Sequence, residues 1–167
     1  MWEILASIPV LGLALMLQVA IFSRLNLLYG SADLILIILA AWGLQERVRS
    51  AWYWAVLAGI LVGYVSGLPW FVPLAGYLLI TAMTRLLRRR VWQAPLLAMF
   101  LVTFTGTLVM HFLSYVVLRL YGDPLPLGDS FNLITLPSIL LNLFLSILIY
   151  PLIRDLAVWI RPGEVDA

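Results

Sequence analysis

The feature that most constrains this chain is an uncharged stretch of 34 residues from Ala51 to Thr84. One membrane crossing needs about 20 apolar residues, so the stretch is too long for one crossing and just long enough for two. Gly67 and Pro73 enclose a short segment near its middle, and both residue types are typical of turns. The stretch therefore predicts a hairpin of two membrane helices, over residues 51–67 and 70–87.

The composition is that of an integral membrane protein. Of the 167 residues 64% are hydrophobic and 11% are charged, whereas a soluble domain is about 45–50% apolar and about 25% charged. The chain contains no cysteine, which excludes disulfides and thiolate chemistry. All ten basic residues are arginine, and the net charge of +2 does not indicate a nucleic-acid partner.

Four further apolar segments predict membrane spans, at about 4–22, 32–45, 95–120 and 133–153. The second of them has an apolar core of only 11 residues, Leu34–Leu44, so longer neighbours must shield its ends. Pro151 is expected to kink or end the last helix. Residues 154–167 are expected to form an amphipathic or disordered cytoplasmic tail. We expect one all-α domain, a polytopic membrane protein of six transmembrane helices.

The arginines predict how the chain is oriented. Six spans place both termini on one side, together with eight arginines, whereas only Arg24 and Arg119 lie on the other side. Because positive charge is enriched in cytoplasmic loops, both termini are expected in the cytoplasm. The eight are Arg47, Arg49, Arg85, Arg88, Arg89, Arg90, Arg154 and Arg161. The cluster at 85–90 is expected to be an anchor at anionic lipid, with a docked cytoplasmic protein as the alternative.

Gly59, Gly63 and Gly67 recur every four residues within the hairpin. Glycines on one helix face allow the close backbone approach that stabilises helix pairs in lipid. The pattern predicts either packing inside this bundle, which every polytopic protein needs, or a face for a partner helix. We expect the hairpin to be the packing centre of the molecule and Trp70 to anchor its turn at the outer membrane interface. The outer ends around Asp33 and Trp70 are also candidate contact surfaces for a partner.

Few polar side chains lie inside the predicted spans. Gln18 and Asn142 are expected to hydrogen-bond across helices, with a ligand contact as the alternative. His111 is the only histidine and has no carboxylate at helical spacing, so a neutral imidazole bonded to a hydroxyl is favoured over proton transfer. Asp33 is expected to cap a helix, or to contact Arg24 or a partner. The motifs of enzymes, metal sites and cofactor sites are missing, so none of these is expected.

Six short motifs, in this order along the chain, resemble the rod shape-determining protein MreD family. They are Leu17-Gln18, Ala32-Asp33-Leu34-Ile35-Leu36, Gly63-Tyr64-Val65-Ser66-Gly67-Leu68, Pro73-Leu74-Ala75-Gly76-Tyr77-Leu78, Leu136-Pro137-Ser138-Ile139-Leu140-Leu141-Asn142 and Ile149-Tyr150-Pro151-Leu152-Ile153-Arg154. Two positions depart from the family pattern. Ala32 stands where proline is common, and Pro69-Trp70 stands where an acidic residue is common. The role of that carboxylate therefore cannot be transferred to this chain.

The resemblance implies a non-enzymatic scaffold or regulator in the bacterial inner membrane that acts in cell-wall elongation, cell shape and peptidoglycan synthesis. It implies the bitopic protein MreC as a partner, with RodA, a class B penicillin-binding protein and MreB as further candidates, and membrane lipid around the helices. The family is also similar in topology to the substrate-binding subunits of energy-coupling-factor transporters. The alternative is therefore a subunit that binds a vitamin-type small molecule, through Gln18, Asn26, Asp33, His111, Asn132 and Asn142.

Overall fold

The computed structural model describes all residues except 1, 23–28, 47, 89–93, 123–125 and 161–167. The expected all-α architecture is confirmed, since no β-strand occurs among the described residues. The helical elements are α1 (Trp2–Leu17), η1 (Gln18–Phe22), α2 (Leu34–Leu44), α3 (Ala51–Val65), α4 (Phe71–Leu87), α5 (Pro95–Leu120), α6 (Leu127–Asp129), η3 (Ser130–Thr135) and α7 (Leu136–Ile160). The elements η1 and η3 are π-helical, and α6, η3 and α7 form one continuous helix.

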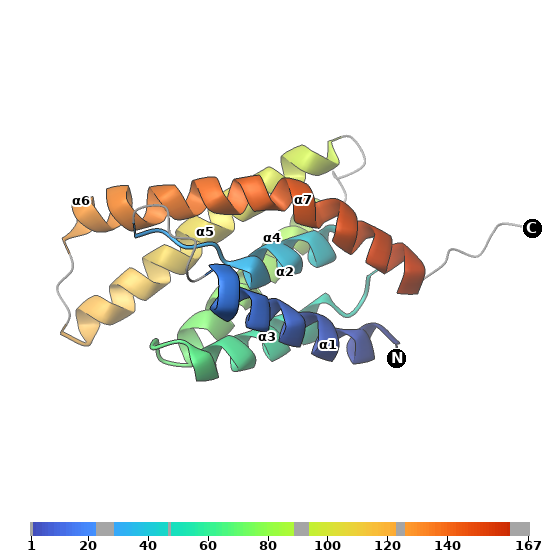
Figure 1. Ribbon diagram of the computed structural model, residues 1–167, viewed down its shortest axis with the longest axis horizontal. Helices are drawn as coiled ribbons and strands as arrows, with labels where there is room; N and C mark the ends of the chain where they lie inside the picture. The colour runs from blue at the N-terminus through green and yellow to red at the C-terminus, as the bar shows by residue number, and fades with distance from the viewer. Residues whose placement is uncertain (1, 23–28, 47, 89–93, 123–125, 161–167) are drawn as a thin grey trace, which may run out of the picture.

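Helix α2 is the centre of the molecule. All 11 of its residues are buried, and it contacts α1, α3, α4, α5 and α7, which surround it in Figure 1. A helix that is apolar on every face must be enclosed by protein or lipid. At a rise of 1.5 Å per residue α2 is only about 16 Å long, so its longer neighbours shield its ends. The expectation that the α3–α4 hairpin is the packing centre was therefore wrong.

The predicted hairpin is formed by α3 and α4, which pack side by side. Its glycines explain the close fit. A Cβ atom on Gly59 would lie 2.6 Å from the Cα atom of Leu74, and one on Gly63 would lie 3.0 Å from the Cα atom of Trp70. These two glycines therefore pack inside the hairpin. Gly67 was wrongly assigned to the same face, because α3 ends before it and a Cβ atom there would meet nothing within 4 Å.

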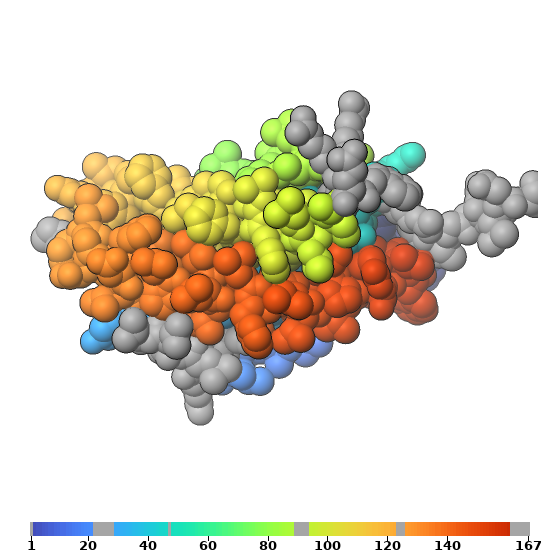
Figure 2. All heavy atoms as spheres, turned by 90° about the horizontal axis from the view of Figure 1, so that it is seen from above, coloured from blue at the N-terminus to red at the C-terminus, as the bar shows by residue number. Residues whose placement is uncertain are grey.

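Within the described part of the chain, three helical segments are long and apolar enough to cross a membrane, namely Trp2–Ile21, Pro95–Leu120 and Leu127–Ile160. Helices α2, α3 and α4 are apolar but shorter, with 11, 15 and 17 residues. Large apolar side chains are exposed on most of the long helices. Two of these helices, α5 and α7, lie side by side on the face shown in Figure 2. Helix length, composition and surface are together compatible with a membrane protein.

The last helix continues through Pro151 to Ile160. Figure 1 shows that its red C-terminal part turns away from the axis of the orange part. Ile153 and Ala157 are buried in the core, whereas Arg154 and Asp155 form an exposed ion pair of 3.1 Å. Of the two alternatives expected from residue 154, an amphipathic or a disordered tail, the disordered one was thus wrong up to Ile160, since these residues continue α7 with one face packed on the core and charged side chains exposed on the other. Residues 161–167 lie outside the described part of the chain.

Candidate functional site

The beginning of α2 is held by polar side chains from three parts of the chain. The first N–H groups of any helix have no partner within the helix. Here the Asp33 carboxylate accepts from the Leu36 N–H at 2.9 Å, and the Gln18 side-chain carbonyl accepts from the Ile35 N–H at 3.2 Å. The Asp33 N–H itself donates to the Asn142 side-chain oxygen at 2.8 Å. Three N–H groups near the start of this buried helix are thereby satisfied.

Two more side chains complete this arrangement. The Tyr77 hydroxyl of α4 donates to the Asp33 carboxylate, with distances of 3.3 and 3.2 Å to its two oxygens. The Asn142 amide group of α7 donates to the Thr107 hydroxyl of α5 at 2.9 Å. The Thr107 hydroxyl in turn donates to the Thr103 carbonyl at 2.8 Å. We call Gln18, Asp33, Tyr77, Thr107 and Asn142 the α2 polar cluster. It joins η1, α2, α4, α5 and α7 at one point.

The structure confirms several predictions for these residues. Gln18 and Asn142 do bond across helices, and Asp33 does cap α2. A contact between Asp33 and Arg24 cannot be described, because Arg24 lies outside the described residues. The sequence reasoning missed Tyr77, although a tyrosine within the uncharged stretch Ala51–Thr84 needs a partner for its hydroxyl when buried. The need of this hydroxyl for a hydrogen-bond partner was the sequence feature that could have indicated Tyr77 as a site residue.

The opposite end of the bundle has its own capping residue, Glu3. Its carboxylate accepts from the Ser50 N–H at 3.1 Å and the Arg49 N–H at 3.3 Å, at the start of α3. The Trp54 indole donates to the Glu3 carbonyl at 2.9 Å and stacks on Trp42 at a centroid distance of 4.1 Å. Sequence reasoning did not predict this contact. A carboxylate in the first turn of an otherwise apolar helix was its only signal.

The basic cluster at the C-terminal end of α4 holds the loop between α2 and α3. Arg85 donates to the Val48 carbonyl at 3.0 Å. Arg88 donates to the Val48 and Glu46 carbonyls at 3.1 and 3.2 Å. Residues 89–90 lie outside the described residues. The two described arginines of the cluster therefore contact the protein itself, in addition to any lipid that they reach.

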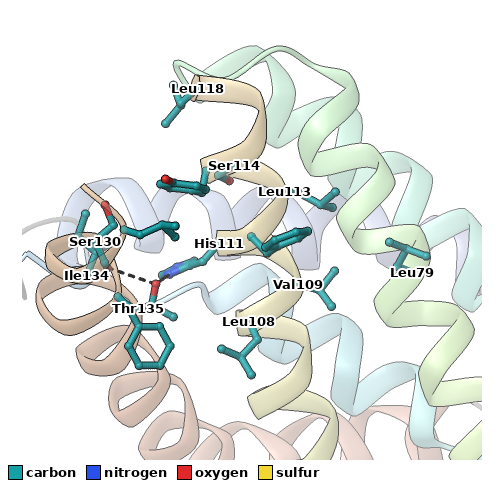
Figure 3. A pocket seen from close by; sticks show the side chains of 14 residues that line it. Leu79, Leu108, Val109, His111, Leu113, Ser114, Leu118, Ser130, Ile134 and Thr135 are labelled. Atoms are coloured by element: carbon teal, nitrogen blue, oxygen red, sulfur yellow. Dashed lines mark hydrogen bonds between the residues drawn. The ribbon is translucent and has the colours of Figure 1, made fainter. Parts of the chain in front are cut away.

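A cavity of about 790 Å³ lies beside the C-terminal half of α5, between α4 and η3 (Figure 3). His111 and Thr135 lie in it and share a hydrogen bond of 3.0 Å. The prediction of a hydroxyl partner for His111 is thereby confirmed. Most of the lining is apolar, with several leucine and phenylalanine side chains.

Trp70 lies at the tip of the hairpin and is 65% exposed. Phe71 meets its ring edge to face at 6.3 Å. Tyr64 and Val65, at the end of α3, are exposed beside this turn. We call Tyr64, Val65, Trp70 and Phe71 the hairpin tip. Of the predicted outer contact residues, Trp70 is exposed, whereas the carboxylate of Asp33 is bonded inside the bundle.

The remaining chemistry of the described residues is sparse. Among them no three His, Cys, Asp or Glu side chains come together to hold a metal ion. No family model, curated protein or solved structure matches the chain. A function can therefore be argued only from the residues and their geometry.

Proposed function

We propose that this chain is a non-enzymatic scaffold of the MreD type in the bacterial inner membrane, with six membrane-crossing helices and both termini in the cytoplasm. Its direct partner is the bitopic protein MreC. Through MreC it acts on RodA, the class B penicillin-binding protein and MreB, and so on cell shape and peptidoglycan synthesis. The observation that carries the proposal is the α2 polar cluster.

In this cluster the polar groups that lie deep in the bundle bind one another. Asp33 and Asn142 bond to backbone and side-chain groups of the same chain, and Gln18 bonds to the backbone of α2. A connected buried network favours one arrangement of the helices over others. A fixed helix arrangement suits a protein that presents a surface to a partner. A polar binding site would instead need such groups to be available to a ligand.

The arrangement of charge supports the proposed orientation. Glu3 accepts hydrogen bonds from the backbone of Arg49 and Ser50 at the start of α3. Arg85 and Arg88 donate to the Val48 carbonyl in the loop just before α3. Arg49, Arg85 and Arg88 therefore lie at one end of the bundle. The C-terminal end of α5, which carries Arg119, lies at the opposite end (Figure 1). Cytoplasmic loops of membrane proteins are the arginine-rich ones. The end with three arginines is therefore the proposed cytoplasmic end.

The hairpin tip is the proposed docking surface for MreC. Gly59 packs on Leu74 of α4 and Gly63 on the backbone of Trp70, so neither offers a face to a partner, whereas the rings of Tyr64, Trp70 and Phe71 are exposed at the hairpin tip. Tryptophan and tyrosine are enriched among the residues that dominate binding energy at protein interfaces.

The test is co-purification with MreC of the same organism. Trp70→Ala is expected to lower the amount of MreC retained at least tenfold, corresponding to about 1.4 kcal/mol, whereas Trp159→Ala is the matched control. Trp159 is 80% exposed but lies near the far end of α7. Failure of the unaltered chain to retain MreC would overturn the proposal.

The second candidate is the substrate-binding subunit of a small-molecule transporter, and the cavity beside His111 is the observation that favours it. Its volume of about 790 Å³ is in the range of about 300–1,000 Å³ that is usual for ligand sites. A vitamin-type molecule released from the purified protein on denaturation would favour this candidate over the scaffold.

A further inference from the structure

The cavity beside α5 is an open groove. Its walls are the C-terminal half of α5, the π-helical η3 and Leu79 of α4. Phe112 and Phe131 line it and are 66% and 47% exposed, so the groove opens to the side of the bundle. We call it the α5–η3 groove. Figure 3 shows His111 and Thr135 meeting across it, with Ile134 and Ser130 on the η3 wall.

The wall formed by η3 is unusual in its backbone. Residues Ser130–Thr135 are π-helical and lead directly into α7. Single π-helical turns within α-helices are rare and occur often at functional sites. Here Ser130, Ile134 and Thr135 all line the groove, so the irregular backbone lies where a ligand would contact it.

The rim of the groove carries a positive charge. Tyr115 lines the groove, and its hydroxyl accepts a hydrogen bond from the exposed Arg119 guanidinium at 2.8 Å. Arg119 lies in the last turn of α5. Its exposed guanidinium is thereby held beside Tyr115, which lines the groove. A guanidinium binds phosphate well, because its planar fork matches two phosphate oxygens.

The lining favours a flexible apolar chain over a second helix. Membrane helices approach one another through glycine, alanine, serine and threonine. The described residues that line the groove include no glycine or alanine, and their small side chains are limited to Ser114, Ser130 and Thr135, whereas leucine and phenylalanine prevail. The large leucine and phenylalanine side chains keep the backbone of a second helix at a distance, whereas a flexible methylene chain can pack between them.

We infer that the α5–η3 groove binds an anionic phospholipid, with an acyl chain between α5 and η3 and its phosphate on Arg119. The inference does not rest on the proposed scaffold function. The expected ligand chemistry has two parts. The apolar walls recognise the chain, and the Arg119 guanidinium favours the net negative charge of an anionic headgroup over the neutral zwitterionic one, although the exposed carboxylate of Asp129 stands next to the lining residue Ser130.

Native mass spectrometry of the full-length, delipidated chain tests both parts. The probes are phosphatidylglycerol and phosphatidylcholine with the same acyl chains. Arg119→Gln removes the charge, and Ser130→Phe fills the groove. Arg154→Gln is the matched control, since Arg154 is also an exposed arginine but lies on α7 far along the chain from the groove. Thermal unfolding of each variant checks that it folds.

The unaltered chain is expected to bind phosphatidylglycerol about tenfold more tightly than phosphatidylcholine, which corresponds to about 1.4 kcal/mol. Arg119→Gln should abolish this difference, Ser130→Phe should weaken both lipids, and Arg154→Gln should change neither. Equal effects of Arg119→Gln and Arg154→Gln would overturn the inference. So would a photo-crosslinker at Phe112 that captures a protein helix in cells and no lipid. Arg119 is exposed, so Arg119→Gln remains decisive if Ser130→Phe does not fold. Retention of MreC is measured separately.

Discussion

Tyr77 and Asp33 are 44 residues apart in the sequence, and the Tyr77 hydroxyl donates to the Asp33 carboxylate. Tyr77 is fully buried in α4, while Asp33 begins α2. The bond therefore ties the start of the central helix to one arm of the hairpin. It links two elements that sequence analysis treated as separate, namely the shortest apolar segment and the uncharged hairpin.

Tyr77→Phe should destabilise the protein by about 1–3 kcal/mol, because the carboxylate loses a charge-assisted hydrogen bond in a buried site. Tyr53→Phe is the matched control, since Tyr53 is exposed on α3 and its hydroxyl is free to reach solvent or headgroups. Reversible unfolding in mixed detergent measures both free energies. Equal losses in the two variants would show that the Tyr77 hydroxyl makes no specific contribution.

Asp33→Ala removes the helix cap and leaves the buried Tyr77 hydroxyl without its acceptor. Loss of a cap costs about 0.5–2 kcal/mol, and an unsatisfied buried hydroxyl costs about 1–3 kcal/mol more. Asp33→Asn keeps a side-chain oxygen that can accept from Leu36, so it should cost clearly less. The same unfolding measurement distinguishes them. If Asp33→Asn were as destabilising as Asp33→Ala, the negative charge and not the cap would be the important property.

Asn142 and Thr107 should be energetically coupled, because the Asn142 amide donates to the Thr107 hydroxyl between α7 and α5. Their coupling is expected to be about 0.6–2 kcal/mol, the range for polar contacts between membrane helices. A double-mutant cycle with Asn142→Ala and Thr107→Val measures it. Strictly additive losses would mean that Asn142 acts only through its other bond, to the Asp33 N–H.

The sequence predicted which polar side chains would be bonded, but not to which partners. An unpaired amide in lipid costs much free energy. The sequence shows that Gln18 and Asn142 lie within apolar segments, so bonds across helices could be predicted for both. Their partners depend on tertiary packing. Asn142 meets Thr107 from 35 residues away, and His111 meets Thr135 from 24 residues away. No local pattern reports such contacts.

The location of the core was misjudged for a different reason. The hairpin was predicted to be the packing centre because of its glycine spacing. Leu34–Leu44, however, is apolar on every face, which is typical of a fully enclosed helix. That signal was available, but the segment was judged mainly by its insufficient length. The glycine series was also extended by one glycine too many, Gly67, because the spacing alone does not show that α3 ends at Val65.

Gly59→Ala should destabilise the α3–α4 hairpin, whereas Gly67→Ala should have no effect. A Cβ atom at Gly59 would lie 2.6 Å from the Leu74 Cα atom, so the two backbones must separate, while at Gly67 it would meet nothing within 4 Å. Overpacking of this kind costs about 1–3 kcal/mol, which exceeds the gain that alanine offers in a helix, about 1 kcal/mol. Unfolding free energies of the two variants check the prediction. A stabilising Gly59→Ala would mean that α4 can move away without loss, and a destabilising Gly67→Ala would place that glycine at a packed interface after all.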